Sequence, residues 1–243
     1  MNIYRSMKDI NEFILYCCTA ILLVVYIFAS QKARADNEIF VDQTGNNFAI
    51  GIEQIGANNN ATVTADGTNQ QLLVIQYDGN NDATVDATGD DNGIKLCQGC
   101  AFDSPESYTN HDYTYDSWES GGHSIDLTVT GNRNGISAQQ TNQGNVGDNG
   151  HSFELNLTGD DNEVTTIQQH NSAKTIDLTI YNDDNDVLIR QKGSGANHNA
   201  TVELDGTYGT DLTLKQFGNV TKSYSLQQNC LTVGGCSVTI TQQ

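Results

Sequence analysis

The stretch Ala83–Gln98, "ATVDATGDDNGIKLCQ", decides how the chain folds. Small apolar and polar residues alternate, a turn follows at "TGDDN", and the alternation then resumes. Such alternation is typical of a strand with one buried face. The parity that turns Val85, Ile94 and Leu96 toward a core also turns Gln98 inward. The pattern therefore predicts an amide that is buried at the end of a strand.

This pattern recurs along the chain, and a fixed period is the mark of a repeat fold. Gln54, Gln76 and Gln98 lie 22 residues apart. One buried amide is costly because it loses its hydrogen bonds to water. A column of amides at the ~4.8 Å spacing of strands is different, because each can donate to one neighbour and accept from the other. The inward amide ladder predicted in this way consists of Gln54, Gln76, Gln98, Gln140, Gln168, Gln191, Gln216, Asn59, Asn81, Asn92, Asn134, Asn162 and Asn185.

Each repeat divides into two half-units, a strand and a turn each, which are too short to hold a helix. The predicted fold is all-β: a β-solenoid with two short strands per ~22-residue rung, about eight rungs, and cross-β stacking. A rung is one full turn of the solenoid. The repeats occupy 36–243, with insertions at 99–123 and 141–150. Both insertions leave the same edge on adjacent rungs, so we expect them to touch. The first contains Trp118 and several Tyr, and is either a recognition loop or a solvated excursion.

The first 35 residues have the organisation of a secretory signal peptide. Arg5 and Lys8 precede an apolar run over 13–29, and "ARA" at 33–35 has the small-x-small form that signal peptidases cut. A transmembrane anchor is the alternative, although ~17 apolar residues are few for a span. We expect cleavage before Asp36 and export of the remainder.

The exported part is strongly acidic. The whole chain has 11 Lys and Arg against 30 Asp and Glu, a net charge of −19. The leader holds four of the basic and two of the acidic residues, so its loss brings the charge near −21. Such a charge repels nucleic acid, which we exclude as a partner. High charge with low hydrophobicity favours disorder, but the regular periodicity argues for a folded repeat.

One motif resembles a known family. Gln54–Ala61 reads Q-x-G-x-x-N-x-A, and Gln76–Ala83 repeats it with Asp78 in place of the glycine. Together with the 22-residue period and the signal peptide, this is similar to curlin, the subunit family of bacterial curli fibres. The resemblance implies a secreted amyloid subunit that passes through curli-type secretion machinery. Such a subunit assembles with itself and other curlin-like subunits at the cell surface, in adhesion and biofilm matrix. Many half-units lack the first Gln of the motif, so a minor subunit, a nucleating subunit or a divergent relative fits at least as well as a major subunit.

An outward array of threonines supports a second hypothesis, a monomeric solenoid that binds ice or a glycan. Asp86, Asp126 and Asp177 interrupt this array, and Thr is a good outward strand residue without any ligand. Its members are Thr62, Thr84, Thr128, Thr130, Thr179 and Thr201.

The cysteines and histidines point to no catalytic or metal chemistry. Cys-x-x-Cys can bind zinc or carry redox chemistry, but an exported chain favours the disulfides Cys97–Cys100 and Cys230–Cys236. The histidines are scattered, and we expect them at the surface or in turns. No nucleophilic or paired-carboxylate arrangement stands out, so we expect no enzyme, no cofactor and no small-molecule substrate. The five histidines are His111, His123, His151, His170 and His198.

The Asp-rich turns form the last predicted feature. At one turn position, successive rungs carry Asp91, Arg133, Asp161 and Asp184. Stacking at ~5 Å would let Arg133 pair with carboxylates on both sides. The three aspartates are weak candidates for calcium, although Asp and Asn suit tight turns without any ligand.

Overall fold

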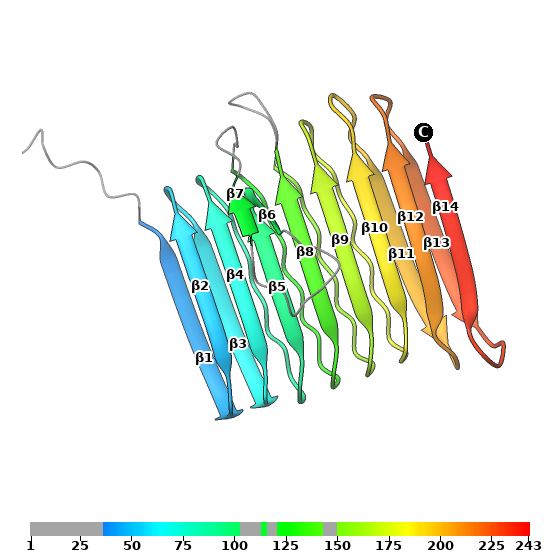
Figure 1. Cartoon of the computed structure of the whole chain (residues 1–243), viewed down its shortest axis with the longest axis horizontal. Coiled ribbons are helices and arrows are strands. Elements are labelled where there is room, and N and C mark those ends of the chain that lie inside the picture. The colour runs from blue at the N-terminus through cyan, green and yellow to red at the C-terminus, as the bar shows by residue number, and fades with distance from the viewer. Residues whose placement is uncertain (1–35, 103–112, 116–120, 143–149) are drawn as a thin grey trace, which may run out of the picture. The chain divides into compact units, whose positions relative to one another are not determined.

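The computed structural model describes residues 36–102, 113–115, 121–142 and 150–243. The predicted signal peptide and the tips of both insertions lie outside these residues. Within them the chain is all-β, without a helix, and its strands stack as a β-solenoid (Figure 1). No helix that could cross a membrane occurs in these ranges.

One face of the solenoid is a parallel sheet of eight strands, which we call the main sheet. Its order is β14-β12-β10-β9-β8-β5-β4-β2, so every strand lies beside the corresponding strand of the next rung. Eight strands separated by seven steps agree with the predicted number of rungs. The strands are β2 (Ala49–Ile55), β4 (Gln71–Tyr77), β5 (Gly93–Gln98), β8 (Gly135–Thr141), β9 (Glu163–Gln169), β10 (Asp186–Lys192), β12 (Thr210–Phe217) and β14 (Cys236–Gln242).

The second face contains regular strands only at its two ends. There β1 (Glu38–Asn46) pairs with β3 (Asn60–Thr68), and β11 (Asn199–Gly206) pairs with β13 (Ser223–Cys230), all parallel. The four rungs between them were also predicted to have a second strand. Their segments instead contain outward residues with positive φ, such as Asp126 at 98° and Thr179 at 81°. These segments still stack on one another. The backbone N–H groups of residues with outward side chains donate to backbone carbonyls of the preceding rung, as the N–H of Thr128 does to the carbonyl of Val85 (3.0 Å).

The core lies between the two faces and is filled by the inward residues of every rung. Val63, Val129, Leu155 and Leu214 are each at most 1% exposed. One hydrophobic cluster extends along the whole stack. This narrow, long core takes the place of the wide core that a chain of such polar composition cannot form. Each rung depends on its neighbours for burial, which leaves the two outer rungs less covered than the rest.

The first insertion is more than a loop. Its described parts form two short antiparallel strands, β6 (Cys100–Phe102) and β7 (Tyr113–Tyr115). Cys100 packs with Ile75 and Cys97 in a small second cluster on the outer face of the main sheet. Outward side chains there are buried, including Lys95 at 0% exposure, and this burial lowers its pKa to about 8. The two insertions were predicted to touch, and their described ends do so, because Gly122 and Gly150 lie against each other. The tips of both insertions lie outside the described residues.

Candidate assembly site

The predicted glutamines form one continuous column along the main sheet. The Nε2 of each glutamine donates to the Oε1 of the glutamine on the following rung, from Gln54 to Gln76 (2.7 Å) through to Gln216 and Gln242 (2.9 Å). The intervening bonds are 2.8–3.3 Å long. The column is therefore directional: donors point toward the C-terminal rung and acceptors toward the N-terminal rung. Gln242 was not among the residues of the predicted ladder, and it completes the column at the last rung.

Each glutamine also bonds to the opposite face of its rung. The Nε2 of Gln76 donates to the carbonyl of Asn60 (2.6 Å), and that of Gln98 donates to the carbonyl of Asp82 (2.7 Å). The same amide thus bridges the two faces and links successive rungs. Both N–H groups are used, which explains how a fully buried Gln76 avoids the cost of an unpaired amide.

The predicted asparagines separate into two columns at opposite corners. The first column, which we call the amide corner, lies where the chain enters the main sheet and carries Gln70, Asn92, Asn134, Asn162, Asn185 and Thr210. Each asparagine Oδ1 accepts the backbone N–H of the residue that follows it in the column, as Asn92 does from Asn134 (2.9 Å). Asn92 also bonds its own turn, because its Nδ2 donates to the Thr88 carbonyl four residues earlier (2.8 Å).

The second column, which we call the mixed corner, lies where the chain leaves the main sheet and carries Asn37, Asn59, Asn81, His123, His151, Lys174, His198 and Lys222. The side chains at its start act as at the amide corner, because Asn59 Oδ1 accepts the N–H of Asn81 (3.1 Å). Further along, a histidine replaces the asparagine. His123 Nδ1 accepts the N–H of His151 (3.0 Å), and His198 Nδ1 accepts that of Lys222 (3.2 Å).

Turn length explains this change of residue type. Asn81 bonds the Tyr77 carbonyl, four residues back (2.8 Å). His198 Nε2 reaches the Lys192 carbonyl, six residues back (3.3 Å), and His151 Nε2 reaches that of Thr141, ten residues back (3.1 Å). Longer turns leave a wider corner, and a larger side chain is needed to bond the carbonyl where the turn begins.

Lys174 fills the same position with an ammonium group. Its Nζ lies 3.0–3.3 Å from four backbone carbonyls, three in its own turn and one at Gly193. The side chain is fully buried. A buried charge is tolerated only when its donors are satisfied, and these carbonyls supply that.

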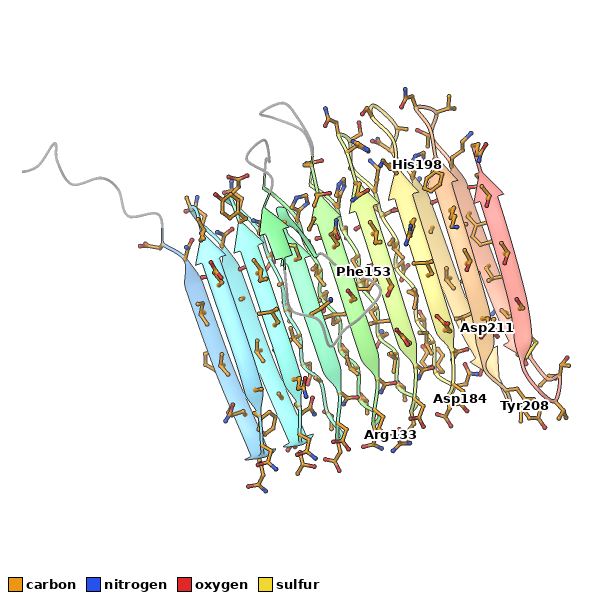
Figure 2. The ribbon with its side chains drawn as sticks, viewed as in Figure 1. Arg133, Phe153, Asp184, His198, Tyr208 and Asp211 are labelled. Atoms are coloured by element: carbon orange, nitrogen blue, oxygen red, sulfur yellow. A yellow bond between two sulfur atoms is a disulfide. The ribbon has the colours of Figure 1, made fainter. Side chains whose placement is uncertain are left out.

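The histidines were predicted to lie at the surface or in turns, and three of them lie at turns but are buried rather than at the surface. His123, His151 and His198 are at most 1% exposed (Figure 2 labels His198). Burial lowers the pKa of His123 to about 3 and lowers those of His151 and His198. A sequence signal did exist, because each lies two residues before the first inward apolar residue of the next segment, as Asn59 and Asn81 do. His111 lies outside the described residues, and His170 is partly exposed in a turn.

The Asp-rich turns lie at the amide corner, where Figure 2 shows Arg133 and Asp184. Arg133 makes two bonds of 2.6 Å to Asp161, and its second carboxylate neighbour is Asp160 (4.0 Å). Asp91 lies beyond ion-pair distance from it in the described part of the chain, which corrects the prediction of pairing on both sides. Asp91, Asp161 and Asp184 are not part of any group of three or more His, Cys, Asp or Glu side chains arranged to hold a metal ion in that part.

Both predicted disulfides are present. Cys97–Cys100 has a Cα–Cα distance of 5.5 Å and closes the neck of the first insertion. Cys230–Cys236 has a Cα–Cα distance of 5.8 Å and closes the last turn at the amide corner.

The predicted threonine array does not form one column. Thr62, Thr84 and Thr201 occupy the first outward position of the second face, whereas Thr128 and Thr179 occupy the next, and Thr130 the third. The first position is interrupted on adjacent rungs by Asp126, Glu154 and Asp177. The six threonines therefore do not form the single regular array on which the second hypothesis relies.

The two outer rungs are the most exposed apolar part of the described molecule. Ile39, Phe40 and Val41 on β1 are 41–57% exposed, and Leu231 and Val233 after β13 are 69% and 81% exposed. Inward residues of these rungs, among them Ile52 and Ile240, are only partly buried. Both ends therefore present apolar side chains beside unpaired strand edges.

Comparison with known protein families, curated proteins and solved structures finds no match to this chain.

Proposed function

We propose that this chain is a secreted structural subunit of an extracellular, curli-like amyloid fibre, and that it grows by end-to-end stacking of copies. The observation that carries the proposal is the pair of open outer rungs. Each exposes strand edges, partly buried apolar residues and one end of a directional glutamine column. A further rung would complete all three, and a second copy of the chain supplies such a rung.

The direction of the glutamine column makes the stacking polar. Gln54 Oε1 is buried and has no hydrogen-bond partner in the described structure. Gln242 lies at the other end, where donors point outward from the stack. The C-terminal rung of one copy is thus complementary to the N-terminal rung of the next, whereas two like ends would oppose donor to donor or acceptor to acceptor.

The setting of this activity rests on the sequence. The motif at Gln54–Ala61, the period and the leader favour export through curli-type machinery, and a role in adhesion or biofilm matrix at a bacterial cell surface. Two disulfides fit an oxidising compartment. The partners proposed are other copies of the chain and curlin-like subunits, and the role involves no catalysis, cofactor or small-molecule substrate.

Seeded growth tests the proposal. Purified residues 36–243, which form one compact unit, are incubated with thioflavin T, with and without sonicated fibres of the same protein. We expect a lag phase that seeds abolish, and fibres with a ~4.8 Å reflection along their axis. A protein that stays monomeric at high concentration in the presence of seeds would rule out this function.

A further inference from the structure

One inward column of the second face changes character at its two ends. On the inner rungs this position is apolar and at most 3% exposed. On the first and last rungs it is a glutamine, because Gln43 pairs with Ala65 and Gln228 pairs with Leu204. The column in rung order is Gln43, Ala65, Ala87, Val129, Leu157, Ile180, Leu204 and Gln228.

The remaining inward positions of the two outer rungs also correspond in kind. Val41 matches Leu226 on the second face, and Ile52 matches Ile240 on the main sheet. Gln54 matches Gln242 at the end of the main sheet. If the last rung of one copy is followed by the first rung of the next, apolar residues meet apolar residues in the strand columns named above, and glutamine meets glutamine in two.

We propose that Gln43 and Gln228 form an amide pair that is buried only at the junction between two copies, and that this pair makes the outer rungs selective for each other. The inference rests on the proposed end-to-end stacking and names the residues that recognise the partner. Neither side-chain amide has a hydrogen bond within the described residues. At the junction each would leave water, and only the other lies in the same column to satisfy it. If an inner rung were stacked against an outer rung instead, its apolar side chain in this column would leave the buried glutamine amide without a hydrogen-bond partner.

The same glutamines admit an opposite interpretation, in which they are polar caps that keep the ends of the solenoid in water. The two interpretations predict opposite effects of a leucine substitution on self-association. A cap that is replaced by leucine should increase self-association, whereas one half of an amide pair that is replaced by leucine should weaken it.

The experiment measures the soluble concentration that remains in equilibrium with fibres. Gln43→Leu and Gln228→Leu are each expected to raise this concentration about tenfold to a hundredfold, because one amide is left unpaired in the junction. The double variant is expected to return to within about threefold of wild type, since replacing both partners by apolar groups is nearly neutral. Gln227→Ser, at the outward neighbour of Gln228, is the matched control and should change little.

Mixing the two single variants removes folding as an explanation. In an equimolar mixture with polar stacking, copies can alternate so that every junction contains either two glutamines or two leucines. We therefore expect the mixture to assemble far better than either variant alone, which a misfolded chain could not do. Equal assembly of all variants, stronger assembly of either single variant, or no recovery on mixing would overturn the amide pair. Failure of the wild type to assemble would instead overturn the proposed function.

Discussion

The amide corner and the mixed corner solve one structural problem with different chemistry. Each must satisfy the backbone groups of a turn and pass a hydrogen bond to the next rung. At the amide corner, short turns allow Asn92, Asn134 and Asn185 to do both with an amide. At the mixed corner, longer turns require histidine or lysine. The consequence is that the buried asparagine bonds of the amide corner contain no titratable group, whereas the corresponding bonds of the mixed corner contain histidine and lysine.

The tautomer of the histidines follows from their bonds. His198 Nε2 faces a carbonyl and must carry the proton, while Nδ1 accepts a backbone N–H. Protonation of Nδ1 would remove this acceptor and place a charge in a buried column. His151 has His123, Lys174 and His170 as its charged or titratable neighbours, all of which disfavour its protonation. The mixed corner therefore requires neutral histidines, and the predictions below separate it from the amide corner.

The largest expected effect is at Lys174. Lys174→Met keeps the length of the side chain but leaves four buried or partly buried carbonyls without their donor. We expect the free energy of unfolding to fall by about 2–4 kcal/mol, measured from urea unfolding curves. Lys192→Met, at an exposed position, is the control and should change stability by less than about 0.5 kcal/mol. Equal effects of the two substitutions would contradict a structural role for the buried ammonium group.

Substitution of an asparagine at the amide corner should lower the free energy of unfolding slightly less than substitution of Lys174 does. Asn134→Leu removes the acceptor of the Asn162 N–H (3.0 Å) and the donor to the Gly159 carbonyl (2.9 Å). We expect a loss of about 2–3 kcal/mol, since two buried backbone groups lose their partners. The loss should be the same at pH 7 and pH 5, because no group in this bond set titrates there. A loss that varied with pH would break the distinction between the corners.

The pH dependence should come from the mixed corner. Burial holds the pKa of His123 at about 3, against ~6.5 in an unfolded chain. Between these values the unfolded state binds the proton and the folded state does not, so stability falls as pH drops below about 6.5. Each such histidine contributes a slope of up to about 1.4 kcal/mol per pH unit.

His123→Asn measures this contribution directly, because Asn59 and Asn81 already serve as acceptors in the same column. We expect the variant to lose some stability at pH 7 and to show a shallower decline between pH 6 and pH 4, as followed by urea unfolding. Burial raises the pKa of Glu163 and Asp186, and these groups therefore make stability rise as the pH falls. Their contribution is the same in the variant and in the wild type, so it cancels in the comparison. Parallel curves for the variant and wild type would contradict buried neutral histidine.

The smallest effect is expected at the exposed turn of the amide corner. The hydrogen bond to Asp161 raises the pKa of Arg133, and the guanidinium lowers that of the Asp161 carboxyl. Arg133→Asp replaces this pair with a fourth carboxylate in the column that already holds Asp91, Asp161 and Asp184. We expect modestly slower fibre growth at low ionic strength, and recovery in added salt. Growth at the wild-type rate in low salt would mean that this exposed pair does not affect assembly.

Periodicity predicted the parts of the fold that depend on which way a side chain points. The solenoid, the number of rungs and the glutamine column could be located because inward parity and spacing are visible in sequence. Both disulfides were predicted from the short spacing of the cysteines and the expected export of the chain. The asparagines Asn59 and Asn92 could not be separated into two corners by parity alone, since both point inward.

Other features depend on information that alternation does not contain. The positive φ values of Asp126 and Thr179 occur in segments whose pattern is the same as that of β3. The burial of Lys95 results from the insertion that covers its outward face. The burial of the histidines was not predicted because the turns before them differ in length. Their shared position becomes visible only when residues are counted back from the first inward apolar residue of the next segment.

The central claim is polar stacking of the last rung of one copy on the first rung of another, and disulfide trapping tests it most directly. Glu53 and Thr241 are outward neighbours of Gln54 and Gln242, so cysteines there would lie ~5 Å apart across the junction without disturbing the glutamine column. Fibres are grown from an equimolar mixture of the Glu53→Cys and Thr241→Cys variants, oxidised, and separated by mass. The account predicts cross-linked dimers that contain one copy of each variant. Dimers of two identical variants, or fibres in which no cross-link forms, would contradict it.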